Sequence, residues 1–264
     1  MNEIAQKKLF LLDMDGTVYF ENELIPGARE FIDTLIRTGR DYVFMTNNSS
    51  KSAGLYLEKL KKIGLPADET NIFTSGMAAS VYIKQQKSSP RIYVVGTSSL
   101  RKELSENGIE VSEDGKGEID FLLVGYDTEL EYKKLEIACD ILCRGIPFLA
   151  TNPDVVCPVR NGRYLPDCAT ICYMLEKATG EAPFYIGKPR REMALCAVDW
   201  KGGNADDCAI VGDRIYTDIA CGKNADIYSV LVLSGESTRD DIEKYGIFPD
   251  LVVNSVKDLT PSLL

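Results

Sequence analysis

Short apolar runs that alternate with helix-like stretches constrain the fold of this chain more than any other feature. The runs are rich in Val, Ile, Leu and Phe and have the length of strands. Alternation of this kind predicts strand–helix–strand units and mostly parallel sheets. Runs that are apolar almost throughout, such as 228–233, fit burial on both faces of a sheet. We therefore expect an α/β fold.

The pattern predicts nine strands and at least six helices. Strands are expected over 8–13, 41–46, 71–74, 91–95, 120–124, 146–151, 208–212, 228–233 and 250–253. Helices are expected over 27–38, 51–63, 131–143, 168–179, 190–199 and 238–245. Glycines follow four of these helices, as is common just past a helix end.

Nine strands are more than one compact sheet of this size needs, so two α/β domains are expected. The polar stretches 87–90 and 180–183 have the composition of linkers, and the segment between them has its own strands and helices. We predict a Rossmann-like parallel-sheet core domain formed by 1–79 and 183–264, with an α/β domain inserted at 80–182.

Charge and hydropathy limit the partners. The formal net charge is −10, which disfavours nonspecific binding to nucleic acid or to anionic membranes. The first apolar run, 9–12, is too short for a signal peptide or a membrane span. We therefore expect a cytoplasmic protein with neither nucleic acid nor membrane as a partner. An anionic substrate would need a cation to offset the acids.

The spacing of the cysteines and the lack of histidine limit the metal sites and catalytic mechanisms that this chain can have. The eight cysteines include no CxxC, and free thiols are expected. The pairs Cys139/Cys143 and Cys168/Cys172 could hold a soft metal, but small core residues are the favoured interpretation. The chain has no histidine, which excludes Ser-His-Asp and Cys-His mechanisms and histidine-ligated zinc. Acid–base chemistry must come from carboxylates, lysine, tyrosine or cysteine.

Two carboxylates, Asp13 and Asp15, directly follow the apolar run 9–12. In open α/β sheets, ligands bind outside the carboxyl ends of the strands, so this pair faces a site rather than a core. Aspartate is also common at turns, and the pair alone is a weak signal. Its meaning depends on whether other strand ends supply matching groups.

Two of these strand ends carry groups that suit a phosphate. The segment 46–50, Thr-Asn-Asn-Ser-Ser, offers hydroxyls, amides and backbone N–H groups to an oxyanion. The alternative is that Ser49 or Ser50 caps the next helix. Lys188 follows the apolar run 184–186 and could neutralise a phosphoryl group or an aspartate. The alternative for it is a solvated lysine.

The last strand end adds two more acids, Asp213 and Asp218, after the run 208–211. Mg²⁺ prefers oxygen ligands and often bridges carboxylates to substrate phosphates. Alternatively, Asp218 caps a helix that begins there. Each alternative is tenable alone, but the joint occurrence of all four segments at strand ends favours a single site.

In order along the chain, these segments resemble the four motifs of the haloacid dehalogenase-like superfamily of phosphohydrolases: DxDGT at 13–17, Thr46 with Asn47, Lys188, and Asp213 to Asp218. Further stretches are similar to the NagD-like subfamily, which includes the para-nitrophenyl phosphatases; they are 25–28, 46–49, 151–154 and 187–189. The α/β cap of that subfamily lies between the second and third motifs. The resemblance covers essentially the whole chain and implies that 80–182 is a cap.

The resemblance also implies a role for each motif residue. Asp13 would be the nucleophile that forms an aspartyl-phosphate, and Asp15 the general acid and then the base. Thr46 and the Asn47 backbone would hold the phosphoryl oxygens, and Lys188 would neutralise charge. Mg²⁺ would be bound by Asp13, Asp15 (through its carbonyl) and Asp213, with Asp218 either as an additional ligand or as a residue that supports the direct ligands.

General chemistry agrees with these roles. A carboxylate nucleophile divides hydrolysis into two easier steps, and phosphoryl transfer needs mainly positioning and charge stabilisation. Asp15 would need a raised pKa in order to be protonated near neutrality.

The expected substrate is a small organic phosphate monoester of the sugar phosphate, phosphoglycolate, pyridoxal phosphate or nucleotide type. Asn152 and Asp154 in the cap, with residues 167–170, are candidates for leaving-group contacts; the alternative is an ordinary Asx/Pro turn. Two other functions stay open: a phosphotransferase, and a phosphate-binding regulatory module with little turnover. A homodimer is a further expectation that the sequence does not decide.

Overall fold

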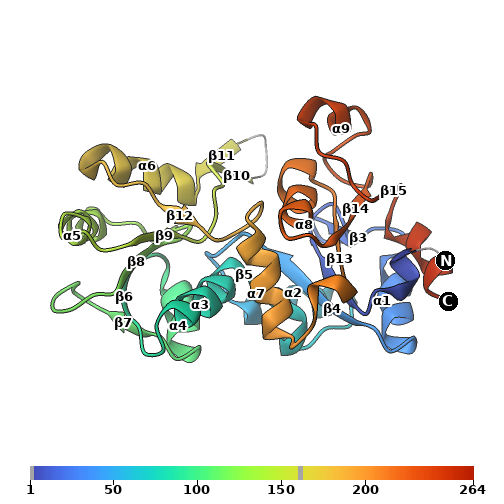
Figure 1. Cartoon of the computed structure of the whole chain (residues 1–264), viewed down its shortest axis with the longest axis horizontal. Coiled ribbons are helices and arrows are strands. Elements are labelled where there is room, and N and C mark those ends of the chain that lie inside the picture. Colours follow the sequence, from blue (N-terminus) through green and yellow to red (C-terminus); the bar gives the residue numbers. More distant parts are fainter. Residues whose placement is uncertain (1–2, 160–162) are drawn as a thin grey trace. The chain divides into compact units, whose positions relative to one another are not determined.

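Two sheets of parallel strands, each with its own helices, organise the chain (Figure 1). The structure is a computed structural model that describes residues 3–159 and 163–264. It divides into two units, which we call the core unit and the inserted unit. The core unit comprises Met1–Thr46, Ala53–Phe73 and Lys188–Leu264, and the inserted unit comprises Asn47–Ser52 and Thr74–Gly187.

The core unit contains a six-stranded sheet in the order β15-β14-β13-β1-β4-β5. Neighbouring strands from β15 to β4 run parallel. Their bounds are β1 (Leu9–Leu12), β4 (Asp41–Thr46), β5 (Ile72–Thr74), β13 (Cys208–Gly212), β14 (Tyr228–Val232) and β15 (Leu251–Val253). A short hairpin, β2 (Tyr19–Phe20) and β3 (Glu23–Leu24), follows β1.

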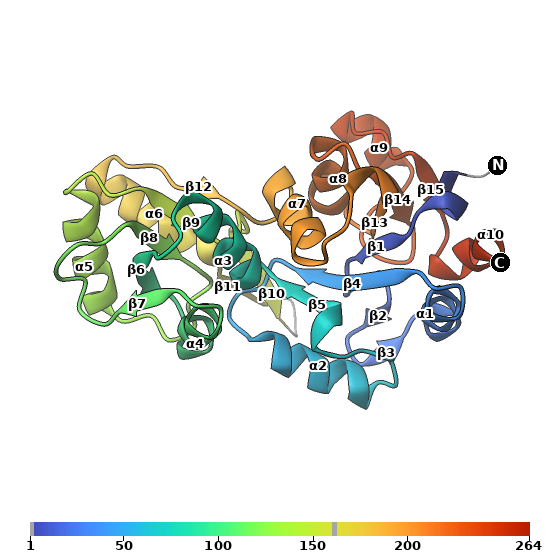
Figure 2. The same ribbon diagram turned by 60° about the horizontal axis from the view of Figure 1, so that its bottom comes forward.

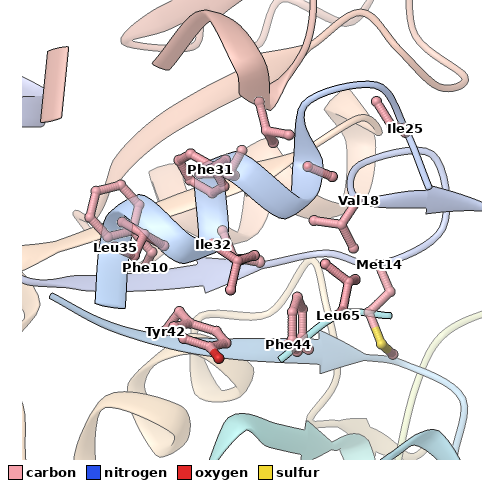
Figure 3. Close-up of a cluster of buried hydrophobic side chains, with 14 of the residues drawn as sticks. Phe10, Met14, Val18, Ile25, Phe31, Ile32, Leu35, Tyr42, Phe44 and Leu65 are labelled. Carbon is pink, nitrogen blue, oxygen red and sulfur yellow. The ribbon is translucent and has the colours of Figure 1, made fainter. Parts of the chain in front are cut away.

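Helices cover both faces of this sheet (Figure 2). They are α1 (Ala28–Arg37), α2 (Ala53–Lys62), α7 (Arg191–Trp200), α8 (Ala220–Asn224), α9 (Asp240–Tyr245) and α10 (Thr260–Leu263). Figure 3 shows Phe31, Ile32 and Leu35 of α1 pointing toward Tyr42 and Phe44 of β4. Alternate residues of the same strands point to the opposite face and are also fully buried, which explains why the strand sequences are apolar throughout.

The inserted unit contains a five-stranded parallel sheet in the order β12-β9-β8-β6-β7. Its strands are β6 (Arg91–Val95), β7 (Glu110–Ser112), β8 (Phe121–Val124), β9 (Phe148–Ala150) and β12 (Phe184–Tyr185). Its helices are α3 (Ser75–Gln86), α4 (Ser98–Glu106), α5 (Tyr132–Leu142) and α6 (Cys168–Thr179), and β10 (Val156–Val159) and β11 (Arg163–Pro166) form a hairpin. A separate apolar cluster fills this unit. The predicted α/β fold is confirmed.

The unit boundaries lie at Thr74 and Gly187 rather than at 80 and 182. A boundary at 80 would cut α3, which packs against α4 in the inserted unit. The loop 87–90 joins α3 to β6, and the loop 180–183 joins α6 to β12, so both connect elements of one unit. β12 pairs with β9 and therefore completes the inserted sheet.

The segment Asn47–Ser52 belongs to the inserted unit although it directly follows β4. The Oγ of Ser49 is buried, lies 2.9 Å from Thr151 Oγ1 and accepts a hydrogen bond from the N–H of Tyr126. Ser49 is therefore not the cap of α2. Instead, its hydroxyl is hydrogen-bonded to residues that follow two strands of the inserted sheet, Tyr126 after the strand 121–124 and Thr151 after the strand 148–150.

Among the described residues, none of the helices combines the length and the apolar character that crossing a membrane requires. Within the same residues, none of the eight cysteines forms a disulfide, as expected.

Candidate active site

The central strands of the core sheet bring the predicted residues to one edge. Leu12 at the end of β1 lies opposite Val211 of β13 and Phe44 of β4. Because these strands are parallel and in register, the residues that follow them emerge at the same edge. Asp13 and Asp213 lie there, and Thr46 ends β4.

Three carboxylates from this edge form a cluster: Asp13, Asp213 and Asp218. Each offers an oxygen, and these oxygens all lie within 4.8 Å of one another. Asp213 and Asp218 are 2% and 1% exposed, so their charges are shielded from solvent. The Oδ1 atom of Asp213 is buried without a hydrogen-bond partner in the described part of the chain. An orphaned carboxylate oxygen beside two more carboxylates is a donor set that suits a hard divalent cation.

Lys188 joins two members of this cluster. Its Nζ lies 2.6 Å from Asp13 Oδ1 and 2.7 Å from Asp218 Oδ1, and the residue is 4% exposed. Burial alone lowers the pKa of Lys188, but the charges of Asp13 and Asp218 outweigh it, so this pKa is raised and the ammonium stays charged. The lysine is therefore a fixed cation, not the solvated side chain of the alternative interpretation.

The cluster carries more negative than positive charge. Burial, followed by the charge of Asp218, raises the pKa of Asp13, and Lys188 opposes this rise. Burial and Asp218 likewise raise the pKa of Asp213. Two buried carboxylates and the half-buried Asp13 face one buried lysine, and a divalent cation would supply the missing positive charge.

Glycines let the backbone approach these carboxylates. A Cβ on Gly235 would lie 2.0 Å from Asp213 Oδ2, and one on Gly16 would lie 2.5 Å from the same atom. Gly16 also has φ +85°, a left-handed conformation that favours glycine. The glycine of the DxDGT segment is therefore required both by its conformation and by its contact with Asp213.

Asp218 lies inside a single π-helical turn, Ile215–Ile219, rather than at the start of a helix. Its Oδ2 accepts a hydrogen bond from the N–H of Arg214 at 3.1 Å, and its Oδ1 contacts Lys188. The Asp218 carboxylate is therefore part of the cluster and pairs with Lys188. The interpretation of Asp218 as a helix cap was wrong. Wide turns of this kind are rare and often occur at functional sites.

Asp15 is exposed, unlike the three clustered carboxylates. Its backbone bridges to Tyr19 at the start of the β2–β3 hairpin. Desolvation raises the pKa of Asp15, while Lys59 and Arg214 oppose the rise. The direction is the one that a general acid near neutral pH needs.

Asn47, Asn152 and Asp154 lie together in the inserted unit. Asp154 Oδ2 accepts hydrogen bonds from the Nδ2 atoms of Asn47 at 3.0 Å and of Asn152 at 2.8 Å. Asn152 also donates to Asp167 Oδ1 at 3.1 Å, and Asp167 caps the start of α6. The TNPD segment is thus part of a side-chain network and not only a turn.

Asp167 provides a stability test of this network. Burial raises the pKa of Asp167 to about 6. Because this value lies above that of the unfolded chain, the folded state binds the proton more tightly, and stability is lost as pH rises from about 4 to 6, by up to about 3 kcal/mol. Asp167→Asn has no such titration, and asparagine can also cap a helix. We expect the stability of the variant relative to wild type to increase between pH 4 and pH 7.

Denaturant unfolding at both pH values would measure this difference. Asp140→Asn makes the same chemical change at an exposed position of the inserted unit and is the matched control. An equal shift in both variants, or none in Asp167→Asn, would show that Asp167 is not held in its neutral form.

One site segment was missed from sequence, the loop Ser234–Ser237 after β14. Ser234 Oγ donates to the carbonyl oxygen of Gly16 at 2.8 Å, and the N–H of Glu236 donates to Asp213 Oδ2 at 2.8 Å. The N–H of Ser237 donates to the carbonyl oxygen of Asp213 at 3.1 Å. The sequence signal for this loop was its position just after β14, the strand beside β13, whose end is the fourth to meet the same edge of the core sheet.

Comparison with known families agrees with this fold and this cluster. A model of haloacid dehalogenase-like hydrolases matches residues 10–110, and an HAD-hydrolase-like model matches residues 185–259. The gap between the two matches falls within the inserted unit. The chain belongs to the haloacid dehalogenase-like hydrolases.

Similar proteins narrow the class to the NagD-like phosphatases. The chain is 34% identical to an acid sugar phosphatase of Staphylococcus aureus, with 98% of each chain covered, and 35% identical to a 5'-nucleotidase of Bacillus subtilis, with 96% and 98% covered. The structure of a 4-nitrophenylphosphatase from Thermotoga maritima matches with a TM-score of 0.92 and 36% identity over 100% of both chains. NagD from E. coli matches with a TM-score of 0.87 and 30% identity, covering 96% of this chain and 98% of its own.

Proposed function

We propose that this chain is a Mg²⁺-dependent phosphatase that hydrolyses small organic phosphate monoesters through an aspartyl-phosphate. The observation that supports it best is the position of Asp13. Its carboxylate lies at a strand end, 2.6 Å from a buried lysine and within a cluster of two further buried acids. A carboxylate that is fixed in this way can attack phosphorus without a histidine.

In the first step, a carboxylate oxygen of Asp13 attacks phosphorus and the ester bond to the leaving oxygen breaks. Asp15 gives its proton to that oxygen and becomes a carboxylate. Lys188, with Thr46 and the backbone of Asn47, stabilises the charge on the phosphoryl oxygens. In the second step, Asp15 takes a proton from water, whose oxygen attacks phosphorus and releases inorganic phosphate and free Asp13.

The divalent cation would be held by Asp13, Asp213, Asp218 and the carbonyl oxygen of Asp15. When bound, it would neutralise the acids and draw charge from the phosphoryl oxygens. The orphaned Asp213 Oδ1 and the excess of buried carboxylates support this assignment. Among hard divalent cations, Mg²⁺ is proposed because it commonly pairs with phosphates.

Named relatives support a small phosphate substrate. Sugar phosphatase, 5'-nucleotidase and 4-nitrophenylphosphatase are the activities for which the similar proteins are named. We propose that Asn152 and Asp154 contribute to substrate choice. We also propose a cytoplasmic location and a homodimer.

Phosphate release from a panel of sugar phosphates, nucleotides and aryl phosphates would test the activity directly. Hydrolysis that needs added Mg²⁺ and stops in excess EDTA is expected. Full activity in EDTA would contradict the metal requirement, and binding without turnover across the panel would favour a regulatory module. Transfer of phosphate to an added alcohol in preference to water would favour a phosphotransferase.

A stability measurement tests the cation site without activity. A cation that binds only the folded chain stabilises it, by about 3 kcal/mol when the cation concentration is 100 times the dissociation constant. This stabilisation raises the melting temperature. We expect Mg²⁺ to raise the Tm of the wild type and to have little effect on Asp213→Asn. The control is Asp206→Asn, an exposed aspartate before β13. An equal Mg²⁺ effect in wild type and Asp213→Asn would place the cation elsewhere.

A further inference from the structure

A network of three side chains lies beside the carboxylate cluster and has no part in the steps above. Glu236 forms an ion pair with Arg214, with 3.0 Å between Oε2 and Nε. Its other carboxylate oxygen, Oε1, accepts a hydrogen bond from the hydroxyl of Tyr216. The Tyr216 ring packs against Tyr245 of α9, with 5.6 Å between the ring centroids. The carboxylate that pairs with the Arg214 guanidinium is therefore itself held by Tyr216.

The same residues are bonded to the cluster through their backbones. The N–H of Glu236 donates to Asp213 Oδ2, and the N–H of Arg214 donates to Asp218 Oδ2. An ordinary surface ion pair contributes little to stability, because water competes with it. This pair differs, since each of its members also positions a carboxylate of the site.

Arg214 is suited to contact a ligand. Its side chain is 39% exposed, and it pairs with Glu236 through Nε, while a guanidinium has four further N–H donors. A guanidinium is charged throughout the physiological pH range, so Arg214 presents a cation beside the site. Guanidinium binds carboxylate and phosphate groups through two parallel hydrogen bonds, which gives it geometric selectivity for a second anion.

On the basis of the proposed phosphatase activity, we infer that Arg214 selects phosphate monoesters whose organic part carries a second anionic group, a carboxylate or another phosphate. Glu236 and Tyr216 are positioning residues that hold the guanidinium. In the proposed mechanism, Lys188 and the cation stabilise the charge on the phosphoryl group itself. Arg214, which directly follows Asp213 of the cluster and has a partly exposed side chain, is thus available for the leaving group.

Matched aryl phosphates test this selectivity. Phenyl phosphate, 3-carboxyphenyl phosphate and 1,3-phenylene bisphosphate share one leaving-group framework and differ in the second group. We expect wild-type kcat/KM to be higher for the two anionic esters, and Arg214→Gln to reduce that preference about tenfold or more, mainly through KM. The relative loss for carboxylate and bisphosphate esters then shows which anion the guanidinium recognises.

Variants of the positioning residues separate this role from a structural one. Glu236→Gln and Tyr216→Phe should lower the same selectivity ratio at unchanged Tm, since the Glu236 backbone N–H to Asp213 is kept. Arg239→Gln, at an exposed arginine before α9, is the control and should leave the ratio unchanged.

Two outcomes would overturn the inference: equal wild-type kcat/KM for neutral and anionic esters, or an equal loss for all three esters in Arg214→Gln. A wild-type enzyme that hydrolyses none of the esters, while also failing with 4-nitrophenyl phosphate, would instead contradict the phosphatase proposal itself.

Discussion

Replacing Asp13 by asparagine should lower kcat for any phosphate monoester by a factor on the order of 10⁴ or more, because the amide cannot form the acyl phosphate. The substitution keeps the size of the side chain, and an amide oxygen can still accept a hydrogen bond from Lys188. The expected effect is therefore on kcat, with KM for 4-nitrophenyl phosphate much less changed. Steady-state release of nitrophenol would measure both constants.

Stability distinguishes this loss from misfolding. Burial and nearby acids make a charge at Asp13 costly in the cation-free protein, and asparagine removes that charge while Asp218 still pairs with Lys188. Without added Mg²⁺, the Tm of Asp13→Asn should therefore equal or exceed that of wild type. Activity retained within tenfold of wild type would exclude Asp13 as the nucleophile.

The nine predicted strands are all present because each is apolar almost throughout, a pattern that burial on both faces imposes. Helix α3 was missed for the opposite reason. Its first two turns, Ser75 to Ser80, consist of mostly small residues that are all buried, so no apolar stripe marks it as a helix. Periodicity does not detect a helix segment that is covered all round.

Asp13 and Asp213 were predictable because each directly follows a strand, and parallel strands bring their ends together. The residues that contact these acids were harder to predict from the sequence. The contact between Lys188 and Asp13 joins residues 175 positions apart, and only the fold shows that the same ammonium also reaches Asp218. Glu236 and Arg214 form a charged pair of a kind that is common on surfaces, and their hydrogen bonds to the cluster come from the backbone, which residue identity does not encode.

The division into units was the least predictable feature. Loops 87–90 and 180–183 have linker composition but connect elements of one sheet and its helices. Composition reports that a loop is solvated, not which elements it joins. At Ser49 the sequence suggested a helix cap, while the hydroxyl is used by Thr151 and Tyr126, whose positions depend on tertiary structure.

Asp15→Asn should affect the two chemical steps to different degrees. Loss of a general acid or base typically costs about 10² to 10⁴ in rate. The first step needs the proton only when the leaving oxygen is basic, so an alkyl phosphate should lose far more activity than 4-nitrophenyl phosphate. The second step needs Asp15 as a base whatever the substrate. With 4-nitrophenyl phosphate, the variant should therefore form the aspartyl-phosphate and hydrolyse it slowly.

Rapid mixing with 4-nitrophenyl phosphate would show this as a burst of nitrophenol close to one equivalent of enzyme, followed by slow turnover. The double variant Asp13→Asn/Asp15→Asn is the control and should show no burst, because it lacks the attacking carboxylate. Glu21→Gln, at an acid in the hairpin beside Asp15, tests whether loss of any nearby charge has the same effect. Equal losses for alkyl and aryl esters without a burst would mean that Asp15 supports the site by charge or structure, and that another group transfers the proton.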